Sequence, residues 1–500
     1  MKHGFRLFSR VIMVITVLAT AHNTFAQGDL PTDFLSKDFH AERRQKLREK
    51  MPPRSVSVFF ANPVRNRAND VDYVYHQDPD FLYLTGYREP NSMLLIFKEK
   101  QKFGGQEYDE IIFVQAKDER AEMWTGRRLG PGGVTSRLGF NVALNGAEFS
   151  RYPVDFSKFD QVLFHDFEND VRNERDSADL YDLIIQFKAK AGYPDKNKAL
   201  LGTEKPANNL NVKMLSDLMD GLRGIKTKEE IDLVNMAVKV SCAGQVEVMK
   251  ALKPGMSERE IQGIHEFVFK KYQAEDLGYP SIVGAGHNGC ILHYIDNYRP
   301  QVNGKDMILM DLGAEYRGYT ADITRTIPIS GKFSNEQKII YEIVLKAQEA
   351  AMAVCKPGTT FRDLTAATRK VVAQGLKENG IITKDEESGK YYPHGCCHHI
   401  GLDVHDRGPY EKLEENMIIT IEPGIYIPEN SKCDPKWWGI AVRIEDDYLL
   451  TKNGHDHLSK PAPRTVKEIE DTMALPSALD DFVLPAIKDR KSTRLNSSHT

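Results

Sequence analysis

The sequence lacks a marked excess of charge of either sign. Its 500 residues include 67 Lys and Arg against 71 Asp and Glu, which gives a net charge of −4. This balance gives no reason to expect nucleic acid or an anionic membrane surface as a partner. Hydrophobic residues make up 41% and charged residues 28% of the chain. These proportions are typical of soluble globular proteins, and the length predicts two or three domains.

The amino terminus has an apolar run that is too short to cross a membrane, since Val11–Ala21 has only 11 residues. Three basic residues precede this run (Lys2, Arg6 and Arg10), and the small residue Ala26 follows it. This pattern is typical of a secretory signal peptide. We expect residues 1–26 to be removed, with cleavage after Ala26 or, as an alternative, after Ala21. No lipid-attachment cysteine follows, so we expect an exported protein, periplasmic or secreted, without a stable membrane anchor.

Cysteine is absent from the first 241 residues. The rest of the chain holds six cysteines, at positions 242, 290, 355, 396, 397 and 433. No CxxC pair occurs, so a zinc site built from cysteines is rejected. An even count in an exported chain leaves a disulfide open. A core of this size needs no such link, however, and the uneven placement favours small buried residues around a site.

Residues 30–205 alternate strand and helix patterns, which predicts an amino-terminal α/β domain. We expect a basic helix over 43–51, strands at 55–60, 93–97 and 111–114, and a helix over 178–190. The stretch 80–90 is expected to be a strand that ends in a glycine turn at Gly86. Histidines and acids do not cluster here with the spacing of metal ligands, so we assign this domain no chemistry. His76, Asp78 and Asp80 come nearest to a metal patch. Pro79 lies between the two acids, which favours a solvated turn instead.

Residues 222–475 predict a second domain that arises from an internal duplication. Thr227 and Glu230 form a capping-box pattern before one helix, and Ser257 caps the next. A similar pair of helix starts recurs at Ser334 and Thr360. Each pair precedes a Gly-Cys-His stretch and an apolar strand that ends in acid-x-Gly, at offsets of 103, 105 and 111 residues. We therefore expect two similar halves around a shared centre.

The stretch from Ile308 to Thr326 predicts two strands joined by a tight turn at Arg317-Gly318. With this turn, Asp311 lies opposite Thr324, and Asp322 lies one diagonal step away on the same face. A shift of the turn by one residue would place the two aspartates directly opposite each other. Both registers bring two carboxylates close together on a half-buried strand pair.

Two carboxylates this close repel each other. Either they share one proton, or a cation neutralises them so that both can be ionised. A shared proton would suit an acid hydrolase. The rest of the chain favours a cation site, because His398, Glu422 and Glu445 follow in the second half. Four carboxylates and one imidazole suit two divalent cations that prefer oxygen, with Mn²⁺ before Zn²⁺.

These residues stand in a distinctive order. The two aspartates are separated by ten residues, and HGxxHxxGLDVHD from His394, an EPG turn at Glu422 and RIED from Arg443 follow. Over residues 43–469 the chain resembles the pita-bread-fold metallopeptidases, and among them aminopeptidase P. The resemblance implies an α/β (α+β) protein with an N-terminal α/β domain followed by a pseudo-twofold pita-bread catalytic domain. It also implies a homodimeric or homotetrameric hydrolase, which removes the first residue from peptides with proline in second position.

The resemblance further implies roles for individual residues. Two divalent metal ions, Mn²⁺ first with Zn²⁺ or Co²⁺ as alternatives, would be held by Asp311, Asp322, His398, Glu422 and Glu445. Glu422 would also take a proton from the attacking water. His293 would shuttle protons, and His405 would contact the substrate carbonyl or oxyanion. The proline pocket would be walled by His394, Tyr426 and Arg443.

Three other functions stay open at this point. A prolidase shares the ligands but accepts only Xaa-Pro dipeptides. A pita-bread binding module without metals and a metal-free relative of the creatine-hydrolase type are both disfavoured by the complete ligand set. The stretches Asp80–Pro90 and Trp124–Pro131 resemble aminopeptidase P, which favours an open cleft beyond the proline. Residues 489–500 lack apolar periodicity, and we interpret them as a disordered, non-native tail.

Overall fold

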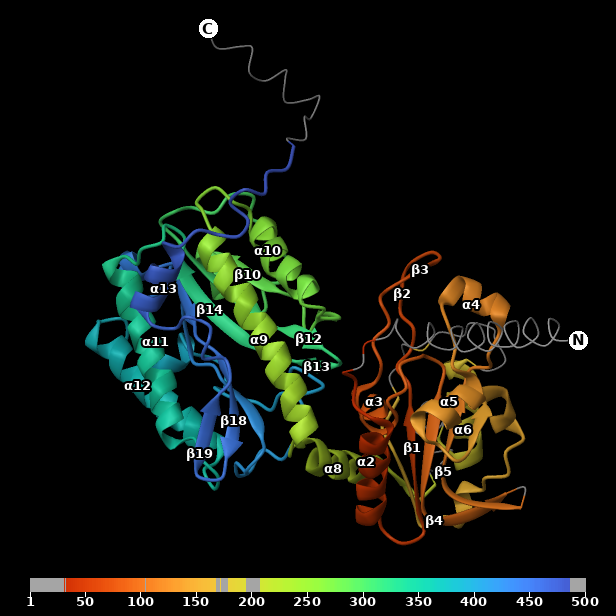
Figure 1. Cartoon of the computed structure of the whole chain (residues 1–500). Coiled ribbons are helices and arrows are strands. Elements are labelled where there is room, and N and C mark those ends of the chain that lie inside the picture. Colours follow the sequence, from red (N-terminus) through yellow and green to blue (C-terminus); the bar gives the residue numbers. More distant parts are fainter. Residues whose placement is uncertain are drawn as a thin grey trace, which may run out of the picture.

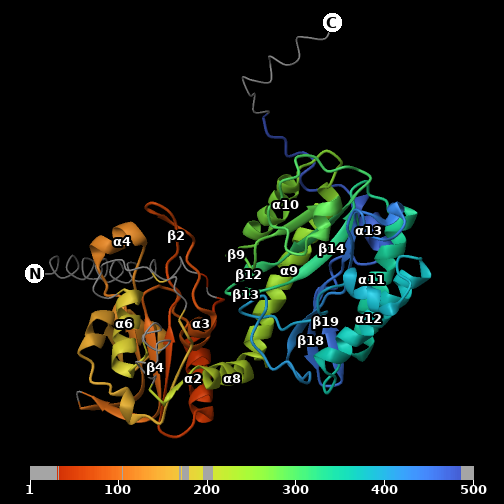
Figure 2. The same ribbon diagram turned by 180° about the vertical axis from the view of Figure 1, so that it is seen from behind.

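The computed structural model describes residues 31–485 apart from residues 32, 104, 168–170, 172–178 and 195–206. The expected signal peptide (residues 1–26) and the tail (residues 489–500) therefore lie outside the described residues. The chain forms an N-terminal and a C-terminal domain side by side, and helix α8 (Val212–Arg223) connects them (Figure 1). The view from behind shows the same two parts (Figure 2).

The N-terminal domain is built on a six-stranded sheet in the order β6-β5-β4-β1-β7-β8. Its central strand, β1 (Ser55–Phe60), pairs antiparallel with β4 and parallel with β7. The other strands are β4 (Met93–Phe103), β5 (Gln106–Val114), β6 (Ala143–Asn145), β7 (Gln161–Phe164) and β8 (Leu210–Asn211). The strands expected at 55–60, 93–97 and 111–114 are confirmed. Because β8 belongs to this sheet, the sheet continues past residue 205.

Helices cover this sheet: α2 (Lys37–Lys50), α3 (Pro79–Thr85), α4 (Glu119–Thr125), α5 (Gly130–Leu138) and α6 (Leu180–Ala191). A small hairpin, β2 (Asn66–Ala68) and β3 (Val71–Asp72), projects beside α4 (Figure 1). Helix α2 begins six residues before the expected position, because the Ser36 hydroxyl accepts a hydrogen bond from the Phe39 amide and caps it. Helix α6 confirms the helix expected over 178–190, of which residue 178 lies outside the described residues.

The strand predicted from Asp80 to the glycine turn at Gly86 is wrong, because this segment forms helix α3. The Asp78 side chain accepts a hydrogen bond from the Phe81 amide at 2.8 Å, Pro79 occupies the first turn, and Gly86 ends the helix with φ of 67°. The solvated turn predicted for Asp80 is also wrong. Its carboxylate is buried, and Arg223 donates a hydrogen bond to it at 2.6 Å.

Helices in the C-terminal domain begin where the capping residues predict. They are α9 (Lys228–Ala251), α10 (Glu258–Lys271), α11 (Asn335–Val354) and α12 (Phe361–Glu378), with the short α13 (Val466–Met473) near the end. The Thr227 and Ser334 side chains each form a reciprocal capping box, and the Ser257 hydroxyl caps α10. Thr360 caps α12 in the same way.

The four long helices lie outside two sets of strands (Figure 1). The first set is β9 (Asp276–Leu277), β10 (Ile282–Ala285), β11 (Met307–Leu312), β12 (Ala314–Tyr316), β13 (Tyr319–Thr320) and β14 (Ile323–Pro328). The second set is β15 (Ile418–Ile421), β16 (Gly424–Ile427), β17 (Ile440–Arg443), β18 (Asp446–Thr451) and β19 (Gly454–His457). Two helices thus precede a set of strands twice, which is the recurrence that the duplication predicts.

The structure decides between the two registers of the hairpin. Arg317 and Gly318 adopt φ of 55° and 90°, and Tyr316 pairs with Tyr319 across them. Asp311 lies opposite Thr324, so the first register is confirmed. Between β11 and β12 the chain passes from one sheet to another at Gly313. A Cβ atom there would lie 2.0 Å from the Ala321 carbonyl oxygen, so this crossing requires glycine.

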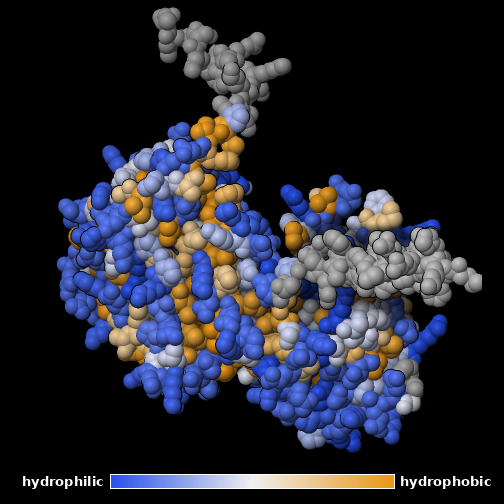
Figure 3. All heavy atoms as spheres, viewed as in Figure 1, coloured by the Kyte–Doolittle hydropathy of each residue, from blue (hydrophilic) through white to orange (hydrophobic). Residues whose placement is uncertain are grey.

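One apolar core joins α9–α12 to the strands of the C-terminal domain, and a second core crosses between the domains. In the second core, Phe81 and Leu84 of α3 belong to the same cluster as Val234 of α9 and Ile400. The surface seen in Figure 3 is largely hydrophilic, with apolar side chains showing between the helices of the C-terminal domain. All six cysteines lie among the described residues and are free thiols. Within the described part of the chain, no helix combines the length and apolar character that a membrane span requires.

Candidate metal centre

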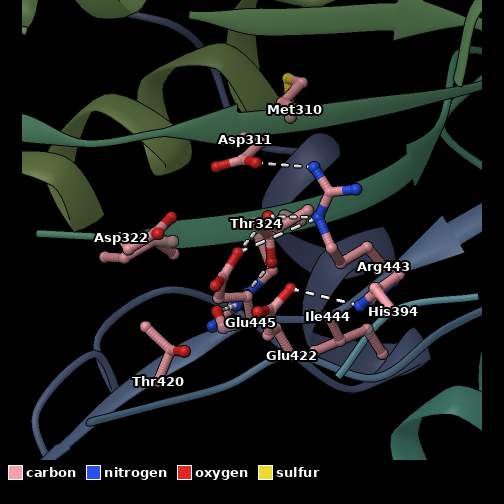
Figure 4. Close-up of polar contacts among 12 residues, drawn as sticks. Met310, Asp311, Asp322, Thr324, His394, Thr420, Glu422, Arg443, Ile444 and Glu445 are labelled. Atoms are coloured by element: carbon pink, nitrogen blue, oxygen red, sulfur yellow. Dashed lines mark hydrogen bonds and ion pairs between the residues drawn. The ribbon is translucent and has the colours of Figure 1, made fainter. Parts of the chain in front are cut away.

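Two buried aspartates lie on the first hairpin of the C-terminal domain. Asp311 is in β11, and Asp322 directly precedes β14 (Figure 4). The hydroxyl of Tyr279 lies 2.6 Å from Asp311 Oδ1 and 2.6 Å from Asp322 Oδ1. One hydroxyl carries one proton, so it can donate to only one carboxylate at a time. The two acids therefore share this single donor.

Asp322 forms a compact group with two residues from the second half, His398 and Glu445. One ligand atom from each lies within 4.8 Å of the others, and all three side chains are buried. His398 Nε2 lies 3.5 Å from Asp322 Oδ2 and 3.8 Å from Glu445 Oε1. Its Nδ1 atom lies 2.9 Å from the His399 carbonyl oxygen, which selects the tautomer with the proton on Nδ1. The unprotonated Nε2 then points at the carboxylates, as a metal-binding imidazole requires.

Glu422 completes the group of five residues that the sequence singled out. It follows β15 at the EPG turn, and its Oε1 atom lies 3.8 Å from His398 Nε2. Its other oxygen lies 3.6 Å from Nδ1 of His394. Burial raises the pKa of Glu422 to about 7, and the negative charge of Asp311 adds to this effect. The folded chain thus brings together all five predicted ligand residues.

Arg443 is the cation that organises one side of this group (Figure 4). Its guanidinium donates to Asp311 Oδ2 at 2.6 Å, to the Tyr426 hydroxyl at 3.0 Å and to Thr324 Oγ1 at 3.1 Å. Thr324 in turn donates to Glu445 Oε2 at 2.6 Å. Arg443 and Tyr426 lie on the paired strands β17 and β16. The predicted grouping of His394 with these two residues is also present, since His394 Nε2 lies 2.9 Å from the Tyr426 hydroxyl.

The carboxylates differ in their electrostatic surroundings. Burial would raise the pKa of Asp311, but Arg443 and Tyr279 outweigh it and hold this pKa below its usual value. Burial and the charge of Asp311 place the pKa of Asp322 well above its usual value. Burial and the charge of Asp322 do the same to Glu445. Divalent cations among these oxygens would offset both the burial and the mutual repulsion. The donor set, rich in carboxylates with one imidazole, therefore fits divalent metal ions.

The remaining two predicted histidines, His293 and His405, are exposed. The ring of His405 stands edge-on to His398 with 4.4 Å between the ring centroids, and its side chain is exposed. His293 is also exposed, on the loop after the 3₁₀ helix Gly286–Cys290. Burial and then Arg443 lower the pKa of His394 to about 4, and the charge of His293 contributes. Burial and the charges of His398 and His293 also lower the pKa of His405.

Comparisons with known proteins agree with this geometry. The family described as "Metallopeptidase family M24" matches residues 232–452, and "Aminopeptidase P, N-terminal domain" matches residues 40–162. The Xaa-Pro aminopeptidase of Escherichia coli is 32% identical over 88% of this chain and 98% of its own length. That of Haemophilus influenzae is 34% identical over the same shares. The chain belongs to metallopeptidase family M24, in its aminopeptidase P branch.

Solved structures of the aminopeptidase P branch share this fold. Aminopeptidase P of Escherichia coli, solved with the inhibitor Pro-Leu, is 31% identical with a TM-score of 0.77, and it matches over 88% of this chain and 98% of its own. The structure of the Pseudomonas aeruginosa aminopeptidase PepP is 33% identical with the same TM-score and coverage. The N-terminal α/β domain and the pita-bread domain expected from the sequence are thus confirmed. The protein is a hydrolase of the metalloaminopeptidase type.

The match to metallopeptidase family M24 spans every candidate catalytic, substrate-binding and metal-ligating residue, from His293 to Glu445. Sequence reasoning missed the contribution of two other polar residues to the centre, Tyr279 and Thr324. Tyr279 follows a glycine and precedes a proline in a segment without a motif, so nothing marked it. The position of Thr324 opposite Asp311 was expected and is confirmed, and what was missed is its hydrogen bond to Glu445.

Proposed function

We propose that this protein is an Xaa-Pro aminopeptidase that uses two divalent metal ions. The observation that carries the proposal is the convergence of Asp322, His398 and Glu445, with Asp311 and Glu422 beside them, in a chain of the aminopeptidase P branch. The two relatives named above are called Xaa-Pro aminopeptidases, and the chain matches them over nearly their whole length. Substrates are peptides with proline in second position.

The residues that would hold the ions are Asp311, Asp322, His398, Glu422 and Glu445. Their oxygen-rich donor set favours Mn²⁺ over Zn²⁺ or Co²⁺ as the native metal. When bound, such ions would lower the pKa of a coordinated water and polarise the carbonyl of the scissile bond. Tyr279, Thr324 and Arg443 orient the carboxylates through the hydrogen bonds described above. In this arrangement the ligands keep their positions before substrate arrives.

Other residues of the site bind substrate or move protons. Glu422 takes the proton of the attacking water. Its two carboxylate oxygens lie near His398 and His394, within the group of predicted ligands. His405 contacts the carbonyl or oxyanion of the scissile bond, and His293 carries a proton to the proline nitrogen that leaves. Both are exposed, and the ring of His405 lies against that of His398. The proline ring lies against the connected group of His394, Tyr426 and Arg443.

The experiment that tests this function compares kcat/KM for Ala-Pro-Ala and Ala-Pro with Mn²⁺ present. We expect the tripeptide to be the better substrate, and chelation to abolish its cleavage. Replacement Asp322→Ala should lower kcat/KM on the order of 10³-fold, because a lost ligand removes several kcal/mol of stabilisation. The matched control is Asp456→Ala, which removes an exposed aspartate on β19. A tenfold preference for the dipeptide would favour prolidase, and full activity in excess chelator would overturn the metal assignment.

Export is also part of the proposal. It is supported by the basic residues before Val11–Ala21 and by the small residue Ala26 after it. Expression of the full chain in a bacterial host should yield a periplasmic or secreted protein that begins at residue 27. Amino-terminal sequencing of the purified protein measures this directly. An intracellular protein that keeps residues 1–26 would contradict export.

Self-association into a homodimer or homotetramer completes the proposal. Support comes from large apolar side chains that the N-terminal domain exposes. Val74, Met123 and Trp124 are 84%, 83% and 88% exposed, and Met123 and Trp124 are neighbours on α4. Apolar side chains of this size that face solvent become buried when chains associate. Light scattering coupled to size-exclusion chromatography should give a mass of two or four chains. A mass of one chain at micromolar concentration would overturn this part.

A further inference from the structure

Gln245 is a fully buried polar residue on α9 that the proposed mechanism does not use. It is 0% exposed. Its Nε2 atom donates hydrogen bonds to the carbonyl oxygen of Met310 at 3.2 Å and to that of Ile323 at 2.8 Å. Met310 directly precedes Asp311, and Ile323 directly follows Asp322. One amide group therefore connects the backbones beside both aspartates, and Figure 4 shows Met310 next to Asp311 on its strand.

Gln348 on α11 makes the corresponding contacts in the second half of the domain. It is also 0% exposed. Its Nε2 atom lies 3.0 Å from the Ile421 carbonyl oxygen and 3.3 Å from that of Ile444. Ile421 directly precedes Glu422, and Ile444 directly precedes Glu445. Gln245 and Gln348 are 103 residues apart, which equals one of the offsets between the two halves of the duplication.

Three of these four carbonyls lie where the strand ladders are interrupted, whereas Met310 lies within β11. Ile323 is the first residue of β14, Ile421 is the last residue of β15, and Ile444 lies between β17 and β18. The chain changes sheets at these points, so buried carbonyls there need donors from outside the ladder. A glutamine amide has two N–H groups in a fixed plane. It can therefore hold two carbonyls from neighbouring segments at a set separation.

Core packing alone does not account for Gln245. Its Oε1 atom is buried without a hydrogen-bond partner, and an unpaired buried acceptor is unfavourable. An apolar side chain of similar volume would avoid this cost. Gln348 differs, because its Oε1 accepts from Arg464 at 2.9 Å and its Nε2 also lies 2.9 Å from Asp446 Oδ2. Gln245 thus gives the cleaner test, since both hydrogen bonds of its side chain go to the metal-centre segments.

We propose that Gln245 and Gln348 are positioning residues that set the separation of the paired carboxylates, Asp311 with Asp322 and Glu422 with Glu445. The inference rests on the proposed function, because it takes these four carboxylates as metal ligands. The two glutamines act through the backbone and touch neither metal nor substrate. Their role is to hold each carboxylate pair at the spacing that a shared ion needs before the ion binds.

The test measures Mn²⁺ dissociation constants of the full chain by competition with a fluorescent chelator. The variant is Gln245→Met, an unbranched side chain of similar volume without donors. We expect Mn²⁺ to bind about 10- to 100-fold more weakly, the range found when hydrogen-bond partners of metal ligands are removed. We expect kcat to fall while KM changes little. Thermal stability should fall only in part, because the loss of two hydrogen bonds is offset by removal of the unpaired Oε1. The matched control is Met249→Leu, a swap at a fully buried apolar position one turn along α9.

Each outcome decides the proposal. A Gln245→Met variant that binds Mn²⁺ within twofold of the wild type overturns it, and so does an equal loss in Met249→Leu. A wild-type chain that binds no Mn²⁺ overturns the proposed function instead, and this inference falls with it. If Gln245→Met does not fold, Gln348→Met takes its place with the same expected weakening. Failure of both variants to fold would assign the glutamines to stability alone and overturn the positioning role.

Discussion

At the scale of single residues, Tyr279 joins the two aspartates that begin the ligand set. Its hydroxyl is the same distance from both carboxylates, 2.6 Å, while Arg443 donates a hydrogen bond to Asp311 but not to Asp322. This asymmetry explains why the pKa of Asp311 is lowered by Arg443 against the effect of burial, whereas burial and the charge of Asp311 raise that of Asp322. The phenol therefore orients the acid that has no cationic partner of its own.

Replacement Tyr279→Phe should weaken metal binding without loss of the fold. The ring stays, but the shared donor is lost, and a hydrogen bond to a charged group contributes about 1.5–3 kcal/mol. We therefore expect kcat/KM for Ala-Pro-Ala to fall about 10- to 100-fold. Steady-state kinetics with Mn²⁺ titration measure this change, and Tyr298→Phe, at an exposed tyrosine, is the control. An unchanged kcat/KM would show that Asp311 and Asp322 keep their positions without the hydroxyl.

The residues of the centre could be predicted from sequence only where each belongs to a motif. Asp311, Asp322, His398, Glu422 and Glu445 stand in a fixed order with characteristic neighbours, and the fold brings them together. Tyr279 belongs to no motif, because its contacts arise only when β9, β10 and the hairpin pack. Asp80 shows the opposite error. Its turn-like neighbours predicted solvent exposure, but Arg223 from a distant helix pairs with it in the interior.

At the scale of elements, local signals decided most boundaries correctly. The turn at Arg317-Gly318 set the hairpin register, because both residues adopt positive φ and only one pairing of the flanking strands is then regular. The capping residues Thr227, Ser257 and Ser334 set three helix starts. Helix α3 could not be predicted in this way. Its residues 80–85 are all buried, so its sequence has no polar face and resembles a buried strand.

The start of α10 also fixes the loop that carries His293. Glu258 is 0% exposed, and its carboxylate accepts from the Ala285 amide, Asn288 Nδ2, the Tyr294 hydroxyl and the Arg299 amide, all within 2.9 Å. Four donors from one loop meet at a single side chain. The loop from 285 to 299 therefore depends on this carboxylate for its shape.

Replacement Glu258→Gln should destabilise the protein by about 2–4 kcal/mol, because an amide offers one acceptor oxygen and leaves buried donors unpaired. Chemical denaturation monitored by circular dichroism measures the free energy of unfolding. The matched control is Glu260→Gln, an exposed position on the same helix. Activity should fall with stability, since His293 lies on the affected loop. Equal stabilities of the two variants would contradict the role given to Glu258.

At the scale of the whole molecule, buried ionic contacts fix the two domains against the metal centre. Arg223 at the end of α8 donates to Asp80 of α3 at 2.6 Å and also pairs with Asp406. Lys226 pairs with the other oxygen of Asp406 at 2.8 Å. Asp406 directly follows His405, whose ring lies against His398. The N-terminal domain therefore helps to hold the loop that carries His405.

Stability of the whole molecule should fall in mild acid because histidines are buried in the neutral form. Burial lowers the pKa of His40 to about 4 and that of His265 to about 3. In the unfolded chain both titrate near 6.5. Between pH 6.5 and 4 the unfolded state therefore binds more protons, so the free energy of unfolding decreases as pH falls. The stabilising effect is complete above pH 6.5 and is lost progressively below it.

The contribution of one histidine can be isolated with His265→Gln, which keeps a polar side chain near Ser281 but does not titrate. The Nε2 atom of His265 lies 2.8 Å from the Ser281 hydroxyl. Urea denaturation measures the free energy of unfolding at each pH. Between pH 7 and pH 4 the wild type should lose about 3 kcal/mol more of it than the variant, because one histidine changes it by up to about 1.36 kcal/mol for each pH unit. The matched control is His287→Gln, which removes an exposed imidazole and should leave the wild-type slope. Parallel curves for the wild type and His265→Gln would mean that His265 takes up its proton without unfolding, and the acid sensitivity would then have to come from other groups.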